Sequence, residues 1–203
     1  MQHHNFGQTA FCGISAMKHR AANFFKDYGS TAIFGLLFGT ILYSLMMTQQ
    51  LTNTFDGLWL QNSYYAGIGE LSSGRWLLAY IDKFLMGIHA DPITSIAALA
   101  FFVTGFLFVL DLFQLENKPG RILCLVLFIS STLISVTLSY RFTSLGYALA
   151  YLFSALSIYA VVKIRNPVMS VGIAGVLLGL SMSCYQAYLA VFCIVAVFYA
   201  IFR

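Results

Sequence analysis

The chain has 203 residues, of which 60% are hydrophobic and only 9% are charged. A soluble domain typically carries about 25% charged residues to solvate its surface, so this composition excludes an ordinary soluble protein. The net charge of +4 is small, and no basic cluster with interleaved aromatic residues occurs, which excludes a nucleic-acid-binding protein.

Long stretches without Asp, Glu, Lys or Arg follow one another along the chain. A helix that crosses the hydrocarbon core of a membrane needs roughly 17 to 25 apolar residues. The uncharged stretches are residues 28–55, 92–110, 122–140, 142–162 and 166–202. The sequence therefore predicts an all-α, multipass integral membrane bundle. Residues 1–30 are expected to form a cytosolic or interfacial lead, and residues 31–203 the membrane domain.

The last uncharged stretch is too long for one crossing. As a single helix it would extend roughly 55 Å at about 1.5 Å per residue, nearly twice the thickness of the hydrocarbon core. A turn at residues 183–186 would divide it into two crossings, and one steeply tilted helix is the alternative. We therefore predict about six spans, with five as the alternative. The predicted spans are residues 31–48, 92–113, 122–139, 143–162, 167–183 and 186–202.

The lysine and arginine residues indicate the orientation of these spans. If the amino terminus is cytoplasmic, the inner side holds Lys18, Arg20, Lys26, Lys118, Arg121, Lys163, Arg165 and Arg203, and the outer side holds Arg75, Lys83 and Arg141. Cytoplasmic loops carry the excess of positive charge in membrane proteins. The distribution therefore predicts that both termini are cytoplasmic and that residues 49–91 form an outer segment.

The first and fifth predicted spans each contain two glycines at four-residue spacing. Gly35 and Gly39 form one pair, and Gly175 and Gly179 form the other. Small residues at this spacing let helix backbones approach closely in a membrane, although such pairs also arise by chance in apolar sequence. A helix contact inside the protein and a chance occurrence are equally compatible with each pair.

The outer segment contains one helical pattern. Between residues 74 and 89 the apolar residues at helical spacing are Trp76, Leu77, Tyr80, Ile81, Phe84, Leu85 and Ile88. Arg75, Asp82, Lys83 and His89 fall largely on the other face of the same pattern. This arrangement predicts an amphipathic helix in the membrane interface, with Trp76 at the level of the headgroups. A helix that only caps the bundle is the alternative.

The stretch between the first span and this helix combines carboxylates with aromatic residues. Asp56, Glu70 and Trp59 are examples, and a sugar pocket needs this mixture, although inert loops contain it as well. Asp56 is the stronger candidate for catalysis, because Gly57 follows it and lets the backbone turn tightly. A carboxylate in this position can accept a proton from an attacking hydroxyl group at the bilayer surface.

Three short motifs give the chain a family resemblance. They are Asp56-Gly57, Gly74-Arg75-Trp76-Leu77 and the sequence SCYQAY from Ser183 to Tyr188. An acidic residue in the first outer loop, followed by an interfacial helix, resembles the GT-C superfamily of membrane glycosyltransferases. The motifs resemble more narrowly the bacterial type II O-antigen glucosyltransferase family, over roughly residues 30–203. GT-C enzymes usually have more spans, so the chain is expected to be a fragment or a reduced relative.

The resemblance implies a reaction and roles for particular residues. A hexose, usually glucose, would move from a polyprenyl-phosphate carrier to a surface polysaccharide or teichoic-acid-like acceptor, outside the bacterial cytoplasmic membrane. Asp56 would be the general base, and Arg75, with Lys83 or Arg141 nearby, would hold the leaving phosphate. Further substrate contacts are implied for Glu70, Trp59, Tyr185 and Gln186. Lipid-headgroup contact is the alternative for the cations, and interface anchoring is the alternative for Tyr185 and Gln186.

No metal site and no cofactor are predicted. The sequence has no DxD or HExxH motif, and the end of a helix before Pro92 explains the close pair His89 and Asp91 better than metal binding does. The expected partners are the lipid-linked sugar donor, the glycan acceptor and the lipid bilayer. Two other functions stay open: a noncatalytic assembly or scaffold subunit, and a lipid-linked sugar transporter. The absence of charge from the predicted spans disfavours the transporter.

Overall fold

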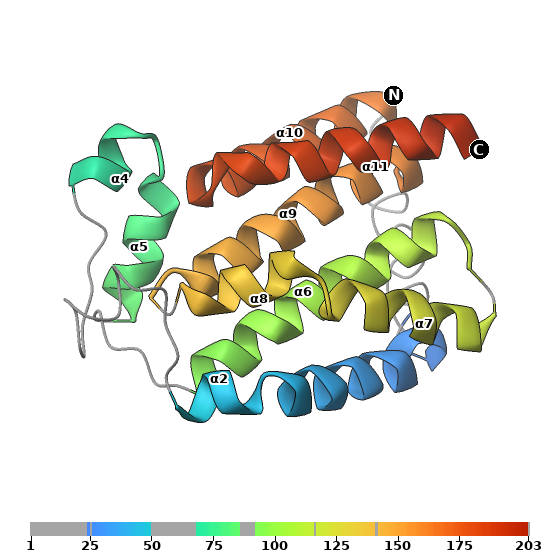
Figure 1. Cartoon of the computed structure of the whole chain (residues 1–203). Coiled ribbons are helices and arrows are strands. Elements are labelled where there is room, and N and C mark those ends of the chain that lie inside the picture. Colours follow the sequence, from blue (N-terminus) through green and yellow to red (C-terminus); the bar gives the residue numbers. More distant parts are fainter. Residues whose placement is uncertain are drawn as a thin grey trace, which may run out of the picture.

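The computed structural model describes residues 24, 26–49, 68–85, 92–115, 117–140 and 142–202. Within these ranges the regular secondary structure is entirely helical, without a strand, which confirms the predicted all-α class. The long helices run along the bundle in alternating directions, and the helices of residues 118–129 and 132–139 follow one another in the same general direction (Figure 1). This up-and-down order places helices that are consecutive in the chain against one another.

The helices begin near the amino terminus with residues 26–42, and α2 (Ser44–Thr48) continues that helix beyond Tyr43. Hydrogen bonds from Tyr43 N to Gly39 O (2.9 Å) and from Met47 N to Tyr43 O (3.0 Å) join the two segments. The later helices are α4 (Ile68–Ser72), α5 (Trp76–Phe84), α6 (Ile93–Leu112), α7 (Lys118–Ile129), α8 (Thr132–Ser139), α9 (Ser144–Lys163), α10 (Pro167–Cys184), the 3-10 helix η1 (Gln186–Tyr188) and α11 (Leu189–Phe202).

Three of the described helices, α6, α9 and α10, are long and apolar enough to cross a membrane. The pair α7 and α8 passes the same test together, with a bend of 45° between them, which gives up to four spans among the described residues. The six predicted spans are therefore supported only in part. One reason lies in α11, whose 14 residues extend about 21 Å at 1.5 Å per residue, less than the roughly 30 Å of a hydrocarbon core.

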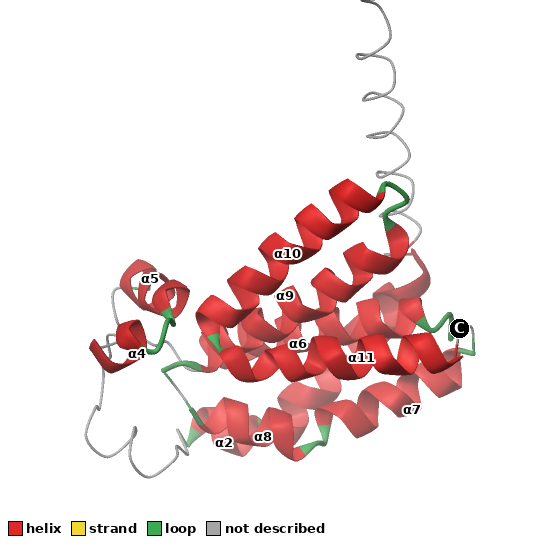
Figure 2. Ribbon diagram, turned by 90° about the horizontal axis from the view of Figure 1, so that it is seen from above, coloured by secondary structure: helices red, strands yellow, loops and turns green. Residues whose placement is uncertain are grey.

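Helix α9 is the centre of the bundle. It packs against α6 on one side and α10 on the other, and Figures 1 and 2 both show it between them. Ala148 and Tyr151 of α9 are buried in one apolar core together with Leu99 and Phe102 of α6 and Leu125 of α7. Helix α9 is therefore anchored in the apolar core of the bundle.

Serine hydroxyl groups join α9 to α10. Ser157 Oγ donates to Ala174 O (2.8 Å), and Ser181 Oγ donates to Ala150 O (2.7 Å) across the same interface. Side-chain hydrogen bonds between membrane helices contribute about 0.6 kcal/mol each on average. These contacts join the uncharged parts of α9 and α10 and fix the register of the two helices.

The two glycine pairs differ in their surroundings. A Cβ atom at Gly35 would lie 2.5 Å from Leu125 Cδ2, and one at Gly39 would lie 2.6 Å from Leu99 Cδ2. This pair therefore marks a close contact of the first helix with α6 and α7. A Cβ atom at Gly175 or Gly179 would meet nothing within 4 Å, so the second pair marks no contact inside the described protein.

The last uncharged stretch is broken at the predicted turn. Helix α10 ends at Cys184, Tyr185 has an extended backbone (φ −159°, ψ 113°), and η1 begins at Gln186. Helix α11 then runs back along the bundle, so the stretch is not one tilted helix (Figure 1). The start of the first helix and the end of α11 both lie at the end of the bundle opposite α4 and α5 (Figure 1).

Helices α4 and α5 lie across one end of the bundle, which we call the α5 end (Figure 1). Trp76, Tyr80 and Phe84, four residues apart in turn, are exposed along one side of α5. Leu78 and Asp82 are each only 1% exposed, so the expectation that Asp82 lies on an open polar face is wrong. The reason is that α5 packs against α10 and the start of α9, which buries the side that carries Leu78 and Asp82.

Candidate functional site

Arg75 stands at the junction between α4 and α5. Its backbone N–H donates to Glu70 O (2.9 Å), which closes the end of α4. Gly74 before it has a φ of +83°, a left-handed conformation that glycine adopts without the steric cost of a side chain. The chain therefore turns sharply at Gly74 and starts α5 at Trp76, with Arg75 at the helix N-cap.

The side chain of Arg75 contacts the break between α10 and η1. Arg75 Nε donates to Gln186 Oε1 (3.5 Å), and the guanidinium carbon lies 4.8 Å from the centre of the Tyr185 ring. Gln186 Nε2 also donates to Ser73 O, so one amide group holds both Arg75 and the turn before it. Three predicted site residues, Arg75, Tyr185 and Gln186, are thus brought together although they are distant in the sequence.

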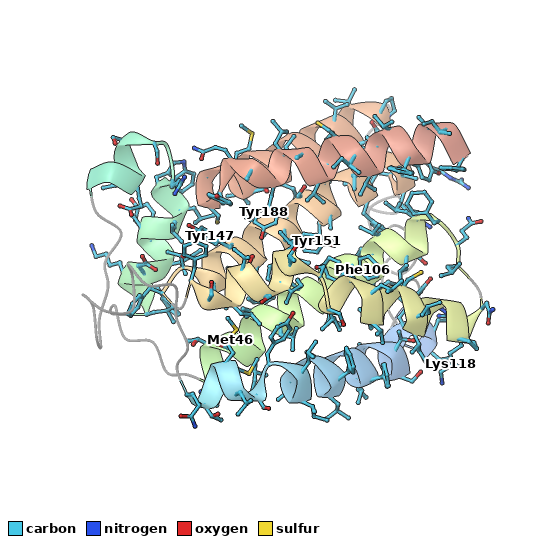
Figure 3. All side chains as sticks on the ribbon, viewed as in Figure 1. Met46, Phe106, Lys118, Tyr147, Tyr151 and Tyr188 are labelled. Carbon is cyan, nitrogen blue, oxygen red and sulfur yellow. The ribbon has the colours of Figure 1, made fainter. Side chains whose placement is uncertain are left out.

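Tyrosine rings continue inward from this contact. The Tyr185 ring stacks on Tyr147 of α9, with 4.4 Å between the ring centres and 28° between the planes. Tyr140 meets Tyr147 edge-on at 6.0 Å, and Tyr188 meets Tyr185 edge-on at 5.9 Å. Figure 3 shows Tyr147 nearest the α5 end, followed by Tyr188 and Tyr151 toward the middle of the bundle. Arg75 therefore lies at the end of a row of aromatic rings.

The charge of Arg75 has no carboxylate partner in the part of the chain that the structure describes. The ion pair found there, Lys163 Nζ to Asp111 Oδ2 (3.0 Å), joins α9 to α6 near the opposite end of the bundle. A guanidinium group can bind a phosphate or carboxylate through two parallel hydrogen bonds, and it also stacks on aromatic faces. Arg75 Nε is directed at Gln186, and its terminal nitrogens make no hydrogen bond to a residue that the structure describes.

Two other predicted site residues are described and lie on the same hairpin. Glu70 is in the first turn of α4, and its backbone carbonyl accepts from Arg75 N. Lys83 is exposed in the last turn of α5, roughly 12 Å further along the helix axis than Arg75. Arg75 and Lys83 are therefore about two helical turns apart along α5 and do not lie side by side on this helix. Asp56, Trp59 and Arg141 lie outside the described residues.

Lys83 lines a separate apolar groove with a volume of about 660 Å³. The other lining residues are Tyr80, Ile81, Phe84 and Leu85 of α5, Phe101 of α6, and Leu145 and Leu149 of α9. Leu145 and Leu149 are two residues away from Tyr147 on either side, so at 100° per residue they lie on roughly the opposite side of α9 from it. The groove and the Arg75 contact are thus on different sides of the α5–α9 crossing.

Tyr147 and Tyr140 were not predicted as site residues. Both occur in uncharged stretches, where a tyrosine is more simply explained by packing or by anchoring at the interface. The usable signal was the spacing of Tyr147 and Tyr151, four residues apart on one helical face. Among the described residues, no three His, Cys, Asp or Glu side chains gather where they could hold a metal ion.

The apolar helices are consistent with a membrane protein, and α4 and α5 lie across one end of its bundle, where Arg75 stands over a row of tyrosine rings. The chain belongs to the glucosyl transferase GtrII family, whose model matches residues 45–203. This range includes Asp56, Arg75, Tyr147 and Tyr185, and the match confirms the predicted family resemblance. No match to the chain was found among curated proteins or among solved structures.

Proposed function

We propose that the protein transfers a hexose, usually glucose, from a polyprenyl-phosphate carrier to a surface glycan at the outer face of the bacterial cytoplasmic membrane. Membership of the glucosyl transferase GtrII family supports glycosyl transfer as the class of reaction. The family does not specify the lipid carrier, the acceptor or the side of the membrane, and these three features are our proposal.

The observation that carries the proposal is the position of Arg75. It holds a positive charge at the bundle end where a short helix lies across the long helices, as a helix in the membrane interface does. A sugar linked to a lipid phosphate presents its anionic group at this level of the bilayer. The terminal nitrogens of Arg75 suit that phosphate, because the planar group can donate two hydrogen bonds at once.

The proposed step is a direct displacement at the anomeric carbon of the sugar. The acceptor hydroxyl oxygen bonds to this carbon, and the bond between the carbon and the carrier's phosphate oxygen breaks. The bonding electrons leave with the phosphate, whose negative charge rises from one to two. Arg75 stabilises this added charge, and the Asp56 carboxylate takes the proton from the hydroxyl group.

The proposed topology has six spans, with both termini in the cytoplasm. Lys118, Arg121 and Lys163 lie toward the end of the bundle that holds the chain ends, whereas Arg75 and Lys83 lie at the α5 end. This separation supports assigning the α5 end to the outer face, following the positive-inside rule. Helix α11 would complete the sixth crossing together with η1.

The proposal is tested by the donor dependence of two Arg75 variants. Arg75→Lys keeps the charge but loses the two-point geometry, so kcat/KM for the polyprenyl-phosphate sugar should fall at least tenfold, and Arg75→Ala should lower it further. Lys118→Gln is the control, because it removes a cation at the opposite end of the bundle, and it should leave the donor dependence unchanged. Wild-type donor dependence in Arg75→Lys would show that Arg75 does not bind the donor phosphate.

A transporter is less compatible with the described residues than a transferase. Asp111 is paired with Lys163 and accepts a hydrogen bond from Tyr159 Oη (3.0 Å) near the ends of α6 and α9. Charges that serve transport stand near the middle of the membrane, where helices are interrupted. A noncatalytic scaffold is the remaining rival, and the Arg75 variants separate it from an enzyme.

A further inference from the structure

We propose that Tyr147, in the first turn of α9, is a positioning residue that fixes the guanidinium group of Arg75 by holding the Tyr185 ring beneath it. The inference rests on the proposed binding of the donor phosphate by Arg75. Tyr147 itself touches neither donor nor acceptor in this proposal.

The first step is that Arg75 is not fixed by its own helix. It is the N-cap residue of α5, with φ −87° and ψ 48°, and its long side chain leaves the end of the helix. An arginine side chain carries about 2 kcal/mol of rotamer entropy, which favours many orientations over one. Its hydrogen bond to Gln186 is long, at 3.5 Å, so the contact with the Tyr185 ring is needed to hold the group.

The second step is that Tyr185 is not fixed by a helix either. It is the extended residue between α10 and η1, and its backbone N–H bonds to Ser181 O (2.9 Å) at the end of α10. Its ring is held by the stacked contact with Tyr147 and by the edge of Tyr188. Stacked and edge-to-face aromatic pairs contribute about 0.5–1.5 kcal/mol beyond the area they bury.

The third step is that Tyr147 belongs to the central helix α9 and packs against the apolar core. It follows Gly146, and a Cβ atom at Gly146 would lie 2.3 Å from Leu78 Cδ1 of α5. Leu78 is three residues after Arg75, about one helical turn away. The pair Gly146 and Tyr147 therefore contacts both the helix that carries Arg75 and the ring that lies under its side chain.

A double-mutant cycle tests this positioning role. Tyr147→Leu removes the stacked ring, so kcat/KM for the lipid-linked donor should fall roughly five- to tenfold while KM for the acceptor stays unchanged, since an aromatic pair is worth about 1 kcal/mol. Tyr147→Phe keeps the ring and should stay within about twofold of wild type. In an Arg75→Lys background, Tyr147→Leu should cost almost nothing more, because its effect passes through Arg75.

The matched control is Tyr159→Leu on the same helix. The Tyr159 ring lies near a cation too, with Lys163 Nζ 5.5 Å from its centre, but toward the opposite end of the bundle. This variant should lower the thermal stability of the purified protein and leave the donor kcat/KM of the folded protein unchanged. If Tyr147→Leu does not accumulate in membranes, Tyr185→Leu replaces it in the same cycle.

Three results would overturn the inference. Additive losses in the double variant would show that Tyr147 acts independently of Arg75. An equal loss in Tyr147→Phe and Tyr147→Leu would assign the effect to the hydroxyl group, and an unchanged donor kcat/KM in Tyr147→Leu would remove the effect altogether. Failure of the proposed function is a separate result, because Arg75→Lys alone would then keep the wild-type donor dependence.

Discussion

Arg75 carries a positive charge that no carboxylate neutralises within the described ranges, and its guanidinium group lies over the Tyr185 ring instead. Such a residue is costly unless it gains a partner, because a cation held near apolar surface loses part of its hydration. An anion that arrives with the substrate supplies this partner. Lys163, by contrast, is already paired with Asp111, and its charge is therefore less able to bind an anion from a substrate.

Asp56 is the residue on which the proposed chemistry depends. Asp56→Asn keeps the size of the side chain but cannot accept a proton, so transfer should fall by about 10²–10⁴-fold, the usual contribution of general acid–base catalysis. The amount of protein inserted into the membrane should not change. Glu70→Gln, made in the same predicted outer segment, should cost less, and transfer rates of the two variants with a saturating donor provide the comparison.

The opposite ranking would exchange the roles of these two carboxylates. If Asp56→Asn and Glu70→Gln both kept nearly wild-type transfer, neither residue would be the general base.

The site residues that could be predicted from the sequence are those with a polar or charged group in an outer segment. Arg75 and Gln186 were identified in this way, and the structure brings them together with Tyr185. Tyr147 was not identified. Its spacing from Tyr151 places both rings on one helical face, but this spacing does not separate a packing role from a positioning role. Its role depends on its contact with Tyr185, a residue distant in the sequence, and such a contact is known only from the tertiary structure.

Among the elements, the crossing of α5 over the first turn of α9 has the greatest consequence for the site. It is a close contact at a glycine, because no side chain fits between Gly146 and Leu78. The Leu78 side chain thus packs directly against the Gly146 backbone, three residues after Arg75 on α5.

Gly146→Ala tests this crossing. The added methyl group would lie 2.3 Å from Leu78 Cδ1, so the Leu78 side chain has to move, and its burial at 1% exposure leaves it little room. Overpacking of this kind costs about 1–3 kcal/mol, and we expect a lower thermal midpoint together with a fall of about tenfold in donor kcat/KM. Combining it with Leu78→Ala should recover part of the activity by making room.

Gly175→Ala is the control for this pair of measurements, because a Cβ atom at Gly175 meets nothing within 4 Å. It should leave both the thermal midpoint and the donor kcat/KM near the wild-type values. Equal effects of Gly146→Ala and Gly175→Ala would contradict a specific role for the α5–α9 crossing.

The positions of the helices along the chain were largely predictable from the sequence, but which side of each helix is buried was not. The lengths of the uncharged stretches predicted α6, α9 and the division of the last stretch near Tyr185, because the thickness of a membrane sets the length of a helix that crosses it. The burial of Asp82 was missed because helical periodicity assigns an apolar and a polar face, whereas α5 has a buried side and an exposed aromatic side. The bend between α7 and α8 at Ser130 and Ser131 also has no marker such as proline.

For the whole molecule, the bundle separates two chemical environments. One end holds the chain ends of the described part and the Asp111–Lys163 pair, and the other holds α5, Arg75 and the tyrosine row. Such polarity suits a reaction at one membrane surface, with the carrier lipid in the bilayer beside the bundle. A transferase with this polarity should act from one side of the membrane only.

Sealed membrane vesicles of known orientation test whether the protein transfers sugar at one face of the membrane only. Right-side-out vesicles that contain the protein are given a polyprenyl-phosphate donor with radiolabelled glucose, and the label in surface glycan is measured. We expect incorporation by the wild type, little by Arg75→Ala, and none in sealed inverted vesicles until they are permeabilised. Incorporation no greater than in vesicles without the chain, or equal incorporation in both orientations, would contradict the account.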